Sequence, residues 1–256
     1  MSTRLVSVVV DCSDPRALGS WWARALGWAV THESSDEVDV APPAGGAEAG
    51  EVELVFVPVS EPKVGPNQVH LDLSSVSPQG HRASVERLLG AGAHEVDLGQ
   101  RADAPFTVLA DPAGNEFCVL EPQDVYRDTG AIAAVAVNCP DPVGLAGFWS
   151  AASGWPVARS EERFAGLRAP GGRGPYLELL PSPGAGLTPR PKDRIHLDVA
   201  PFPGDDLAAE TARLVAAGAR PVDVGQLGPD GSRRPDVTWD VLVAPDGHEF
   251  CVLSPR

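Results

Sequence analysis

The sequence predicts an α+β protein in which two similar halves follow one another, each half consisting of two βαβββ modules. The first observation is a long internal repeat: Val8–Trp28, VVVDCSDPRALGSWWARALGW, recurs as Val135–Trp155, VAVNCPDPVGLAGFWSAASGW. The second is a repeated turn and strand, Asp111–Leu120 (DPAGNEFCVL) and Ala244–Leu253 (APDGHEFCVL). A repeat of this length indicates two domains and not a solenoid.

Alternating strand and helix patterns define the first module of the first half. Leu5–Asp11 is rich in β-branched residues and predicts a strand. A helix should follow, with Ser13 or Asp14 as its N-cap and Pro15 in its first turn, and it should stop at Gly27. Three further strands are expected near 28–32, 37–41 and 52–57.

The second module repeats this order. Val69–Leu73 predicts a strand, and SPQGHRASVERLLGAGA predicts a capped amphipathic helix that ends at Gly90 or Gly92. Strands near Val96, at 106–110 and at 115–120 complete the half. We expect the domains to span residues 1–124 and 130–256, joined near EPQDVYRDTG.

Composition excludes several classes of protein. The chain has 256 residues and a formal net charge of −15, without a block of Lys or Arg, so a nucleic-acid partner or an anionic membrane surface is not expected. The apolar run near the N-terminus is too short for a secretory signal, which favours a cytoplasmic protein. Four cysteines without a CxxC pair support neither a disulfide scaffold nor a structural zinc site of that type.

Three motifs occur in the same order in both halves: SWW…ALGW, VHLDL and DPAGNEFCVL, then GFW…ASGW, IHLDV and APDGHEFCVL. With these motifs the chain resembles the vicinal oxygen chelate superfamily of glyoxalases, bleomycin-resistance proteins and extradiol dioxygenases. It is most similar to tandem glyoxalase-like proteins of the actinobacterial type. The resemblance implies tandem glyoxalase-like domains, in each of which two βαβββ modules form a curled mixed sheet around a cleft.

The resemblance also implies a ligand set for a divalent metal, with one ligand from each of the first, fourth, fifth and eighth strands. The fourth-strand position falls on Glu53 and Glu178, which we align with each other, and the fifth-strand position on His70 and His196. The first-strand position holds Ser7 and Ala134, and the eighth-strand position holds Cys118 and Cys251. The set is therefore incomplete, and a divalent metal and no cofactor remain equal alternatives.

Glu53 with His70, and Glu178 with His196, are the candidate catalytic and metal-binding residues, and each pair is expected to face one cleft. A second group is expected to contact substrate, for two reasons. Strand alternation places the acid of HLD on the same side as the histidine, and the motif tryptophans and the acid after the turn lie where a cleft is expected. This group comprises Asp72, Asp198, Trp28, Trp155, Glu116 and Glu249.

Each of these residues also has a purely structural interpretation. Glu116 and Glu249 begin core strands, the histidines can be satisfied core residues, and Cys118 and Cys251 can be small apolar residues in strands rich in Phe, Val and Leu.

Two functional hypotheses follow. The first is a small-molecule enzyme of glyoxalase-like type that acts on an oxygenated or carbonyl-bearing metabolite by lyase, isomerase or related proton-transfer chemistry, with or without a divalent metal. The alternative is a metal-free binding protein that sequesters an antibiotic or another small molecule. The aromatic content of 6% favours the binder less, since stacking surfaces are scarce. Four modules in one chain are compatible with a monomer or a homodimer.

Overall fold

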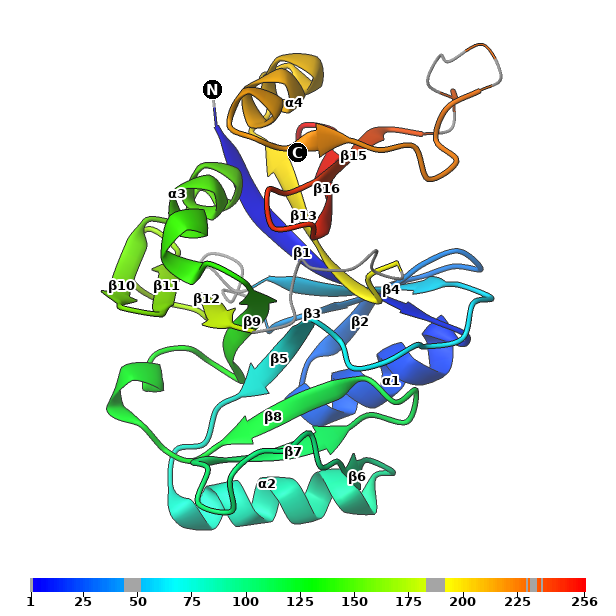
Figure 1. Cartoon of the computed structure of the whole chain (residues 1–256). Coiled ribbons are helices and arrows are strands. Elements are labelled where there is room, and N and C mark those ends of the chain that lie inside the picture. The colour runs from blue at the N-terminus through cyan, green and yellow to red at the C-terminus, as the bar shows by residue number, and fades with distance from the viewer. Residues whose placement is uncertain (1, 44–51, 183–191, 229, 231–233, 236) are drawn as a thin grey trace.

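A computed structural model of the chain describes all residues except 1, 44–51, 183–191, 229, 231–233 and 236. Two eight-stranded mixed sheets form its framework, and helices pack against them (Figure 1). Sheet A has the strand order β14-β15-β16-β13-β1-β4-β3-β2, and sheet B has the order β10-β11-β12-β9-β5-β8-β7-β6. The predicted α+β class, with two βαβββ modules in each half of the chain, is confirmed.

Each module occupies a continuous stretch of the chain. Module 1 contains β1 Thr3–Cys12, α1 Pro15–Leu26, β2 Ala29–Glu33, β3 Val38–Ala41 and β4 Glu53–Pro58. Module 2 contains β5 Val69–Leu73, α2 Pro78–Gly90, β6 His94–Glu95, β7 Phe106–Ala110 and β8 Glu116–Leu120. A short 3-10 helix, η2 Asp124–Tyr126, lies in the junction between the halves.

The second half repeats the pattern. Module 3 contains β9 Ile132–Cys139, α3 Pro142–Ser153, β10 Val157–Glu161, β11 Phe164–Arg168 and β12 Tyr176–Pro181. Module 4 contains β13 Ile195–Pro201, α4 Leu207–Ala216, β14 Arg220–Pro221, β15 Trp239–Val243 and β16 Glu249–Leu253.

The modules combine crosswise, which the sequence did not predict. Sheet A joins module 1 to module 4 through the antiparallel pair β1–β13, and sheet B joins module 2 to module 3 through β5–β9. In Figure 1 the blue β1 accordingly runs beside the yellow β13, far from it in sequence. Every sheet therefore contains one module from each half of the chain.

The first helix forms as its sequence predicts. The Asp14 side chain accepts a hydrogen bond from the Ala17 N–H and caps the N-terminus. Gly27 ends the helix with φ 69°, a left-handed conformation that costs a residue without Cβ little. α3 repeats both features, with Asp141 and Gly154.

The repeated motifs contact one another within each half. Trp22 of α1 lies 5.1 Å from Phe117 of β8, centroid to centroid, and its Nε1–H donates to Asp111 Oδ2 at 3.0 Å. In the second half Trp149 of α3 lies 5.7 Å from Phe250, and its Nε1–H donates to Asp246 Oδ2 at 3.3 Å. The acids of the DPAG and APDG turns are therefore structural acceptors for a tryptophan.

This helix contact explains the crosswise arrangement in part. Because α1 places its bulky apolar side chains against module 2, the two modules of one half meet through a helix and not through neighbouring strands. The edge of β1 is then available to β13 of the other half. A single continuous apolar core includes residues of both sheets as a result.

Candidate functional site

Strand register determines which candidate side chains lie together in sheet A. Glu53 pairs with Ser7, Ser7 with Asp198, and Asp198 with Cys251, so that these four residues form a row across four strands. Directly paired residues of neighbouring strands point to the same face of a sheet. In the next row on that face, Val9 lies between Val55 and His196.

Sheet B contains the equivalent rows from the other two modules. One row runs from Tyr176 through Ala134 and Asp72 to Cys118. The other runs from Glu178 through Ala136 to His70.

These registers correct two expectations. Glu53 shares sheet A with His196, and His70 shares sheet B with Glu178, so neither predicted Glu–His pair faces one cleft. The cause is the crosswise pairing of modules.

The second correction concerns the alignment of Glu53 with Glu178. The strand ends are equivalent, because Pro58 pairs with Cys12 as Pro181 pairs with Cys139. Counting back from these prolines, Glu53 takes the position of Tyr176, and Glu178 takes that of Val55. The acid of the fourth strand therefore sits two residues further along in sheet B than in sheet A.

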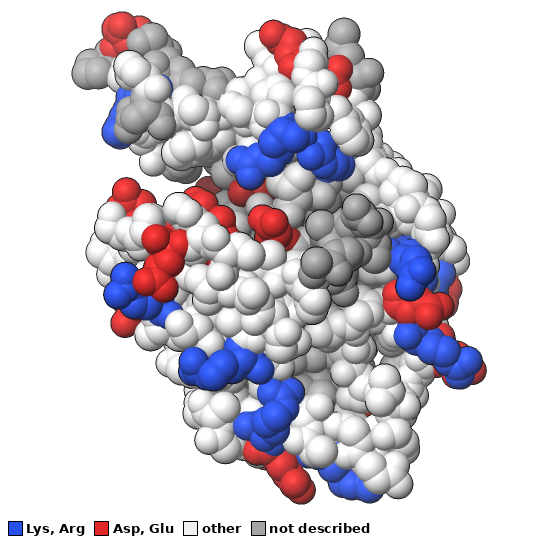
Figure 2. Space-filling view, turned by 180° about the vertical axis from the view of Figure 1, so that it is seen from behind, with Lys and Arg blue, Asp and Glu red and all other residues white. Residues whose placement is uncertain are grey.

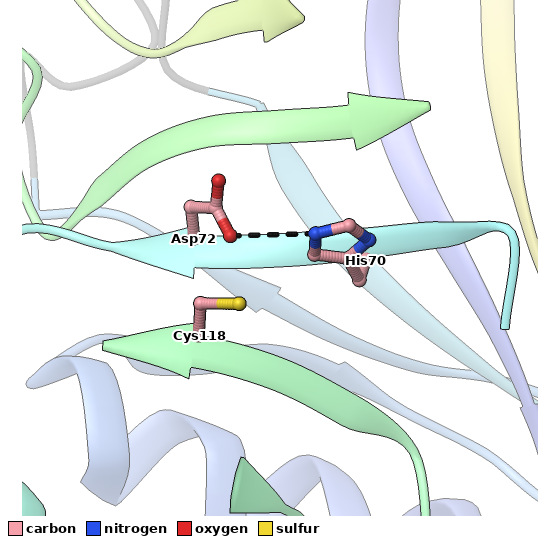
Figure 3. A group of neighbouring side chains, drawn as sticks. All are labelled: His70, Asp72 and Cys118. Atoms are coloured by element: carbon pink, nitrogen blue, oxygen red, sulfur yellow. Dashed lines mark ion pairs between the residues drawn. The ribbon is translucent and has the colours of Figure 1, made fainter. Parts of the chain in front are cut away.

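Each sheet brings a histidine, an aspartate and a cysteine together. In sheet B the ligand atoms of His70, Asp72 and Cys118 all lie within 4.8 Å of one another, and Figure 3 shows the three side chains facing each other. His70 Nε2 lies 3.5 Å from Asp72 Oδ1. His196, Asp198 and Cys251 form the same cluster in sheet A, with the same 3.5 Å separation of imidazole and carboxylate.

Burial shapes the proton affinities of the sheet B cluster. It lowers the pKa of His70 to about 4, and it raises the pKa of Asp72 to about 7, where the negative charge of Glu178 adds to the effect. At neutral pH His70 is therefore uncharged and Asp72 is partly protonated. Burial also raises the pKa of the Cys118 thiol, so the free thiol stays protonated.

In sheet A, burial likewise raises the pKa of Asp198, against the opposing effect of His196, and it raises the pKa of Cys251 well above its usual value. Ser7 Oγ–H donates to Asp198 Oδ2 at 3.3 Å.

The buried carboxylate of Glu178 in sheet B is contacted by a tyrosine and an arginine side chain. Glu178 is only 3% exposed and accepts from the Tyr126 hydroxyl at 3.1 Å, while Arg159 Nη1 lies 3.6 Å from the carboxylate. Tyr126 belongs to η2 in the junction and has no counterpart in the repeat, so motif comparison overlooks it. Burial raises the pKa of Glu178, and the tyrosine and arginine oppose this shift.

Sheet A borders two cavities that share part of their lining. The larger has a volume of about 750 Å³ and is lined by Ser7, Glu53 and Asp198 among others. The smaller, about 380 Å³, is lined by His196, Glu249 and Cys251, and Asp198 borders both. Volumes of about 300–1,000 Å³ are typical of small-molecule sites.

The larger cavity has aromatic, acidic and basic walls. Trp155, Phe202 and Trp239 supply aromatic surface, and Arg4 and Arg256 contribute basic groups. Glu37 and Asp39 add to the acidic wall. Figure 2 shows acidic side chains gathered around a hollow, with Lys and Arg side chains on its border. Of these residues, sequence analysis selected Trp155 alone, because the others stand outside the repeated motifs.

The remaining predicted contacts differ in their surroundings. Glu116 forms an ion pair with Lys63 at 2.7 Å and accepts from the Asn67 N–H at 3.0 Å, so it anchors the segment before β5. Glu249, its repeat counterpart, lines the smaller cavity. Trp28 is half-buried and packs against the apolar core, and it lines neither of the two cavities described for sheet A.

The four-strand metal set that the resemblance implies does not fit these positions. Ala134 carries no donor atom, and neither Glu53 nor Glu178 belongs to a three-residue cluster among the described residues. The cluster of His, Asp and Cys does fit a divalent ion, because it offers one nitrogen, one oxygen and one sulfur donor. Asp72 Oδ1 and Asp198 Oδ1 are buried and accept no hydrogen bond.

Comparison with known proteins agrees with this architecture. The profile of the family described as Glyoxalase-like domain matches residues 7–120 and 134–253, which is most of the chain. The chain belongs to the glyoxalase-like domain family. No match was found among curated protein sequences.

Solved structures of glyoxalase-like proteins share the fold at low identity. Glyoxalase I from Zea mays is 15% identical with a TM-score of 0.68, over 99% of this chain and 92% of that chain. A putative dioxygenase from Bacillus subtilis subsp. subtilis str. 168 is 14% identical with a TM-score of 0.60, over 99% of this chain and 85% of that chain. Among the described residues, none of the helices combines the length and apolar character that a bilayer crossing requires.

Proposed function

We propose that this glyoxalase-like protein binds a small oxygenated or carbonyl-bearing metabolite on the cavity side of sheet A and acts on it by proton transfer. The observation that carries the proposal is the cavity of about 750 Å³ whose wall contains Glu53 and Asp198, one on either side of Ser7. A solvent-accessible base and a buried acid that face one cavity can act on two ends of the same small substrate, as general acid–base chemistry requires.

The roles follow from the surroundings of each group. Glu53 is half-buried and lines the cavity, so its carboxylate is placed to accept a proton from a carbon beside the substrate carbonyl. Burial raises the pKa of Asp198, so this residue keeps a proton more readily and can share it with the developing oxyanion. His196 Nε2, 3.5 Å from Asp198 Oδ1, is the neighbouring group that restores the proton. These two proton roles belong to the metal-free site. If His196, Asp198 and Cys251 hold a divalent ion, Asp198 and His196 carry no proton to donate, the ion would polarise the substrate oxygen as a Lewis acid, and Glu53 keeps its role as the base.

Proton exchange tests the proposal without knowledge of the product. Candidate 2-oxo and 2-hydroxy metabolites are incubated with the protein in D₂O, and loss of the C–H signal is followed by NMR. We expect exchange to fall by about 10²–10⁴-fold in Glu53→Gln. Glu61→Gln, a variant of an exposed acid in the segment after β4, is the matched control and should exchange normally. Equal exchange rates in both variants would refute the role of Glu53.

The aromatic wall supports a second function, which is sequestration of an unchanged ligand. Phe202 and Trp239 both line the larger cavity, where they offer stacking surface to a flat molecule, whereas Trp155 is only 4% exposed. Tryptophan fluorescence titration with aromatic compounds tests this alternative, with Trp239→Ala as the variant expected to lose affinity. Recovery of the ligand unchanged, together with no proton exchange in any candidate substrate, would favour the binder over the enzyme.

The presence of four modules in one chain supports a monomer, because both sheets are completed without a second copy. Light scattering that gives twice the chain mass would contradict this part of the proposal.

A further inference from the structure

We infer that each of the clusters His70–Asp72–Cys118 and His196–Asp198–Cys251 holds one zinc ion, with the aspartate as a ligand in place of residues from the first and fourth strands. This assignment departs from the four-strand set that the family resemblance implies. It depends on the geometry of the clusters and not on the proposed proton transfer.

The separation of imidazole and carboxylate is the first argument. His Nε2 and Asp Oδ1 are 3.5 Å apart in both clusters. Hydrogen bonds from N–H to oxygen span about 2.7–3.2 Å, so this distance is long for a direct bond. Two ligands at about 2.0–2.2 Å from a tetrahedral zinc ion lie about 3.4 Å apart. The observed spacing therefore suits two ligands of one ion.

Unsatisfied carboxylate oxygens are the second argument. Asp72 is 6% exposed and Asp198 is 7% exposed, yet the Oδ1 atom of each accepts no hydrogen bond. A buried polar atom without a partner costs free energy, and a cation at this oxygen removes that cost. Both orphaned oxygens are the ones closest to the histidine of their own cluster.

The third argument is that the same arrangement occurs in two sheets built from different modules. Strand alternation places the histidine and the aspartate of HLD on one face. The register then sets Asp72 beside Cys118 and Asp198 beside Cys251. Nitrogen, oxygen and thiolate sulfur together are ligands that zinc accepts, whereas magnesium and calcium prefer oxygen alone. On binding, each cysteine releases its thiol proton to solvent and forms a sulfur–zinc bond.

The surroundings of the two ions differ. In sheet A the cluster lines the smaller cavity, so the fourth coordination position faces a space that a ligand can enter. In sheet B, the row containing His70 also contains the buried Glu178, which Tyr126 and Arg159 hold. The two clusters are about equally accessible, because the side chains of His70 and Asp72 are 15% and 8% exposed and those of His196 and Asp198 are 16% and 10% exposed.

Metal content of the full chain tests the assignment. The protein is purified without a polyhistidine tag, stripped with a chelator, incubated with zinc alone, desalted and analysed by mass spectrometry. We expect two zinc ions per chain. Asp198→Asn and Cys251→Ala should each leave one, and so should Asp72→Asn and Cys118→Ala. Cys12→Ala, a buried thiol outside both clusters, is the matched control and should keep two. Circular dichroism verifies that every variant is folded.

Two further measurements make the result decisive. Cobalt in place of zinc should give a thiolate charge-transfer band, reduced by about half in Cys118→Ala and in Cys251→Ala. Competition with a chelator should show at least a 100-fold loss of affinity at the altered cluster, more than outer-shell changes cause. Fewer than one zinc per chain would overturn the assignment. So would metal that is lost in Glu53→Gln or Glu178→Gln but kept in both aspartate variants. Loss confined to variants of one cluster would overturn it for the other cluster.

Discussion

Asp111, the first residue of the DPAG turn, should contribute several kcal/mol to the free energy of unfolding. The corresponding turn in the second half of the chain suggests a second substitution that compensates for its loss. Asp111 is fully buried, and its Oδ2 accepts the Trp22 indole N–H at 3.0 Å. Its Oδ1 accepts the backbone N–H groups of Ala113 and Asn115, both at 2.9 Å. Asp111→Ala removes these three bonds and also the bond that the Asn115 side-chain amide donates to Oδ2 at 3.0 Å.

The magnitude follows from the groups that lose their partner. Trp22 is 3% exposed, so water cannot reach its indole N–H to replace the carboxylate as hydrogen-bond acceptor. An unsatisfied buried donor costs about 1–3 kcal/mol. The Ala113 N–H lies nearer the surface and is partly rehydrated, whereas Asn115 is 3% exposed and its N–H stays buried. Burial of the carboxylate itself is unfavourable, as its raised pKa shows, and this offsets part of the loss. We therefore expect Asp111→Ala to lower the free energy of unfolding by about 3 kcal/mol.

The APDG turn suggests the compensating change. There Ala244 replaces the first acid, and Asp246, two residues later, accepts from Trp149 Nε1. Adding Ala113→Asp to Asp111→Ala recreates this arrangement in the first half and should restore at least about 1 kcal/mol. Asp124→Ala removes an acid whose side chain is 93% exposed, and it serves as the charge control.

Urea denaturation followed by far-ultraviolet circular dichroism measures all three variants against the parent chain. A loss below about 0.5 kcal/mol in Asp111→Ala would refute the account of this turn as a buried acceptor site. Absence of rescue in the double variant would refute the equivalence of the two turns.

Three further predictions concern other buried acids. Burial and the charge of Glu37 raise the pKa of Asp39 from 3.8 to about 6, so its ionisation destabilises the fold as pH rises between these values. Asp39→Asn should therefore add about 2 kcal/mol at pH 7 and nothing below pH 4 in urea melts. Tyr126→Phe removes the hydroxyl that donates to Glu178 at 3.1 Å and should cost about 1–2 kcal/mol in the same assay; no change would contradict the role of this bond. Lys63→Met leaves Glu116 without its ion pair, so the melting temperature should fall by a few degrees in calorimetry, and an unchanged value would show that the pair is inert.

Local structure was predictable because its determinants lie within a few residues. The Asp14 cap, Pro15 and Gly27 fix the limits of α1 without help from the rest of the chain. A β-branched run identified β1 for the same reason. The limits differed most at β1, which begins two residues earlier and ends one residue later than expected, and at β6, which covers only His94–Glu95.

Partner choice between modules was not predictable. β1, β5, β9 and β13 all contribute apolar side chains to the core, and nothing in their sequences specifies which two will pair. The choice depends on helix packing, in which Trp22 and Phe117 bring modules 1 and 2 together through α1. The expectation that Glu53 and His70 face one cleft was wrong for this reason, because β4 and β5 belong to different sheets.

The sequence predicted two of the three residues of the sheet B cluster as neighbours, but not the third. Alternation in HLD placed His70 and Asp72 on one face correctly, as their 3.5 Å contact shows. Cys118 joins them only through the pairing of β5 with β8, which a sequence pattern does not specify. The misalignment of Glu53 with Glu178 arose because apolar strands of equal length match equally well in two registers.

The exchange of partners between halves has a consequence for how such a chain diverges. A polypeptide that contained only the first half would leave β1 without β13 and β5 without β9. Two copies would then have to pair their strands with each other to complete the sheets. Identical copies give identical pockets, so every substitution would appear in both. Fusion into one polypeptide ends that symmetry, so Tyr126 can bind the buried Glu178 in one sheet while Glu53 in the other sheet lines a cavity.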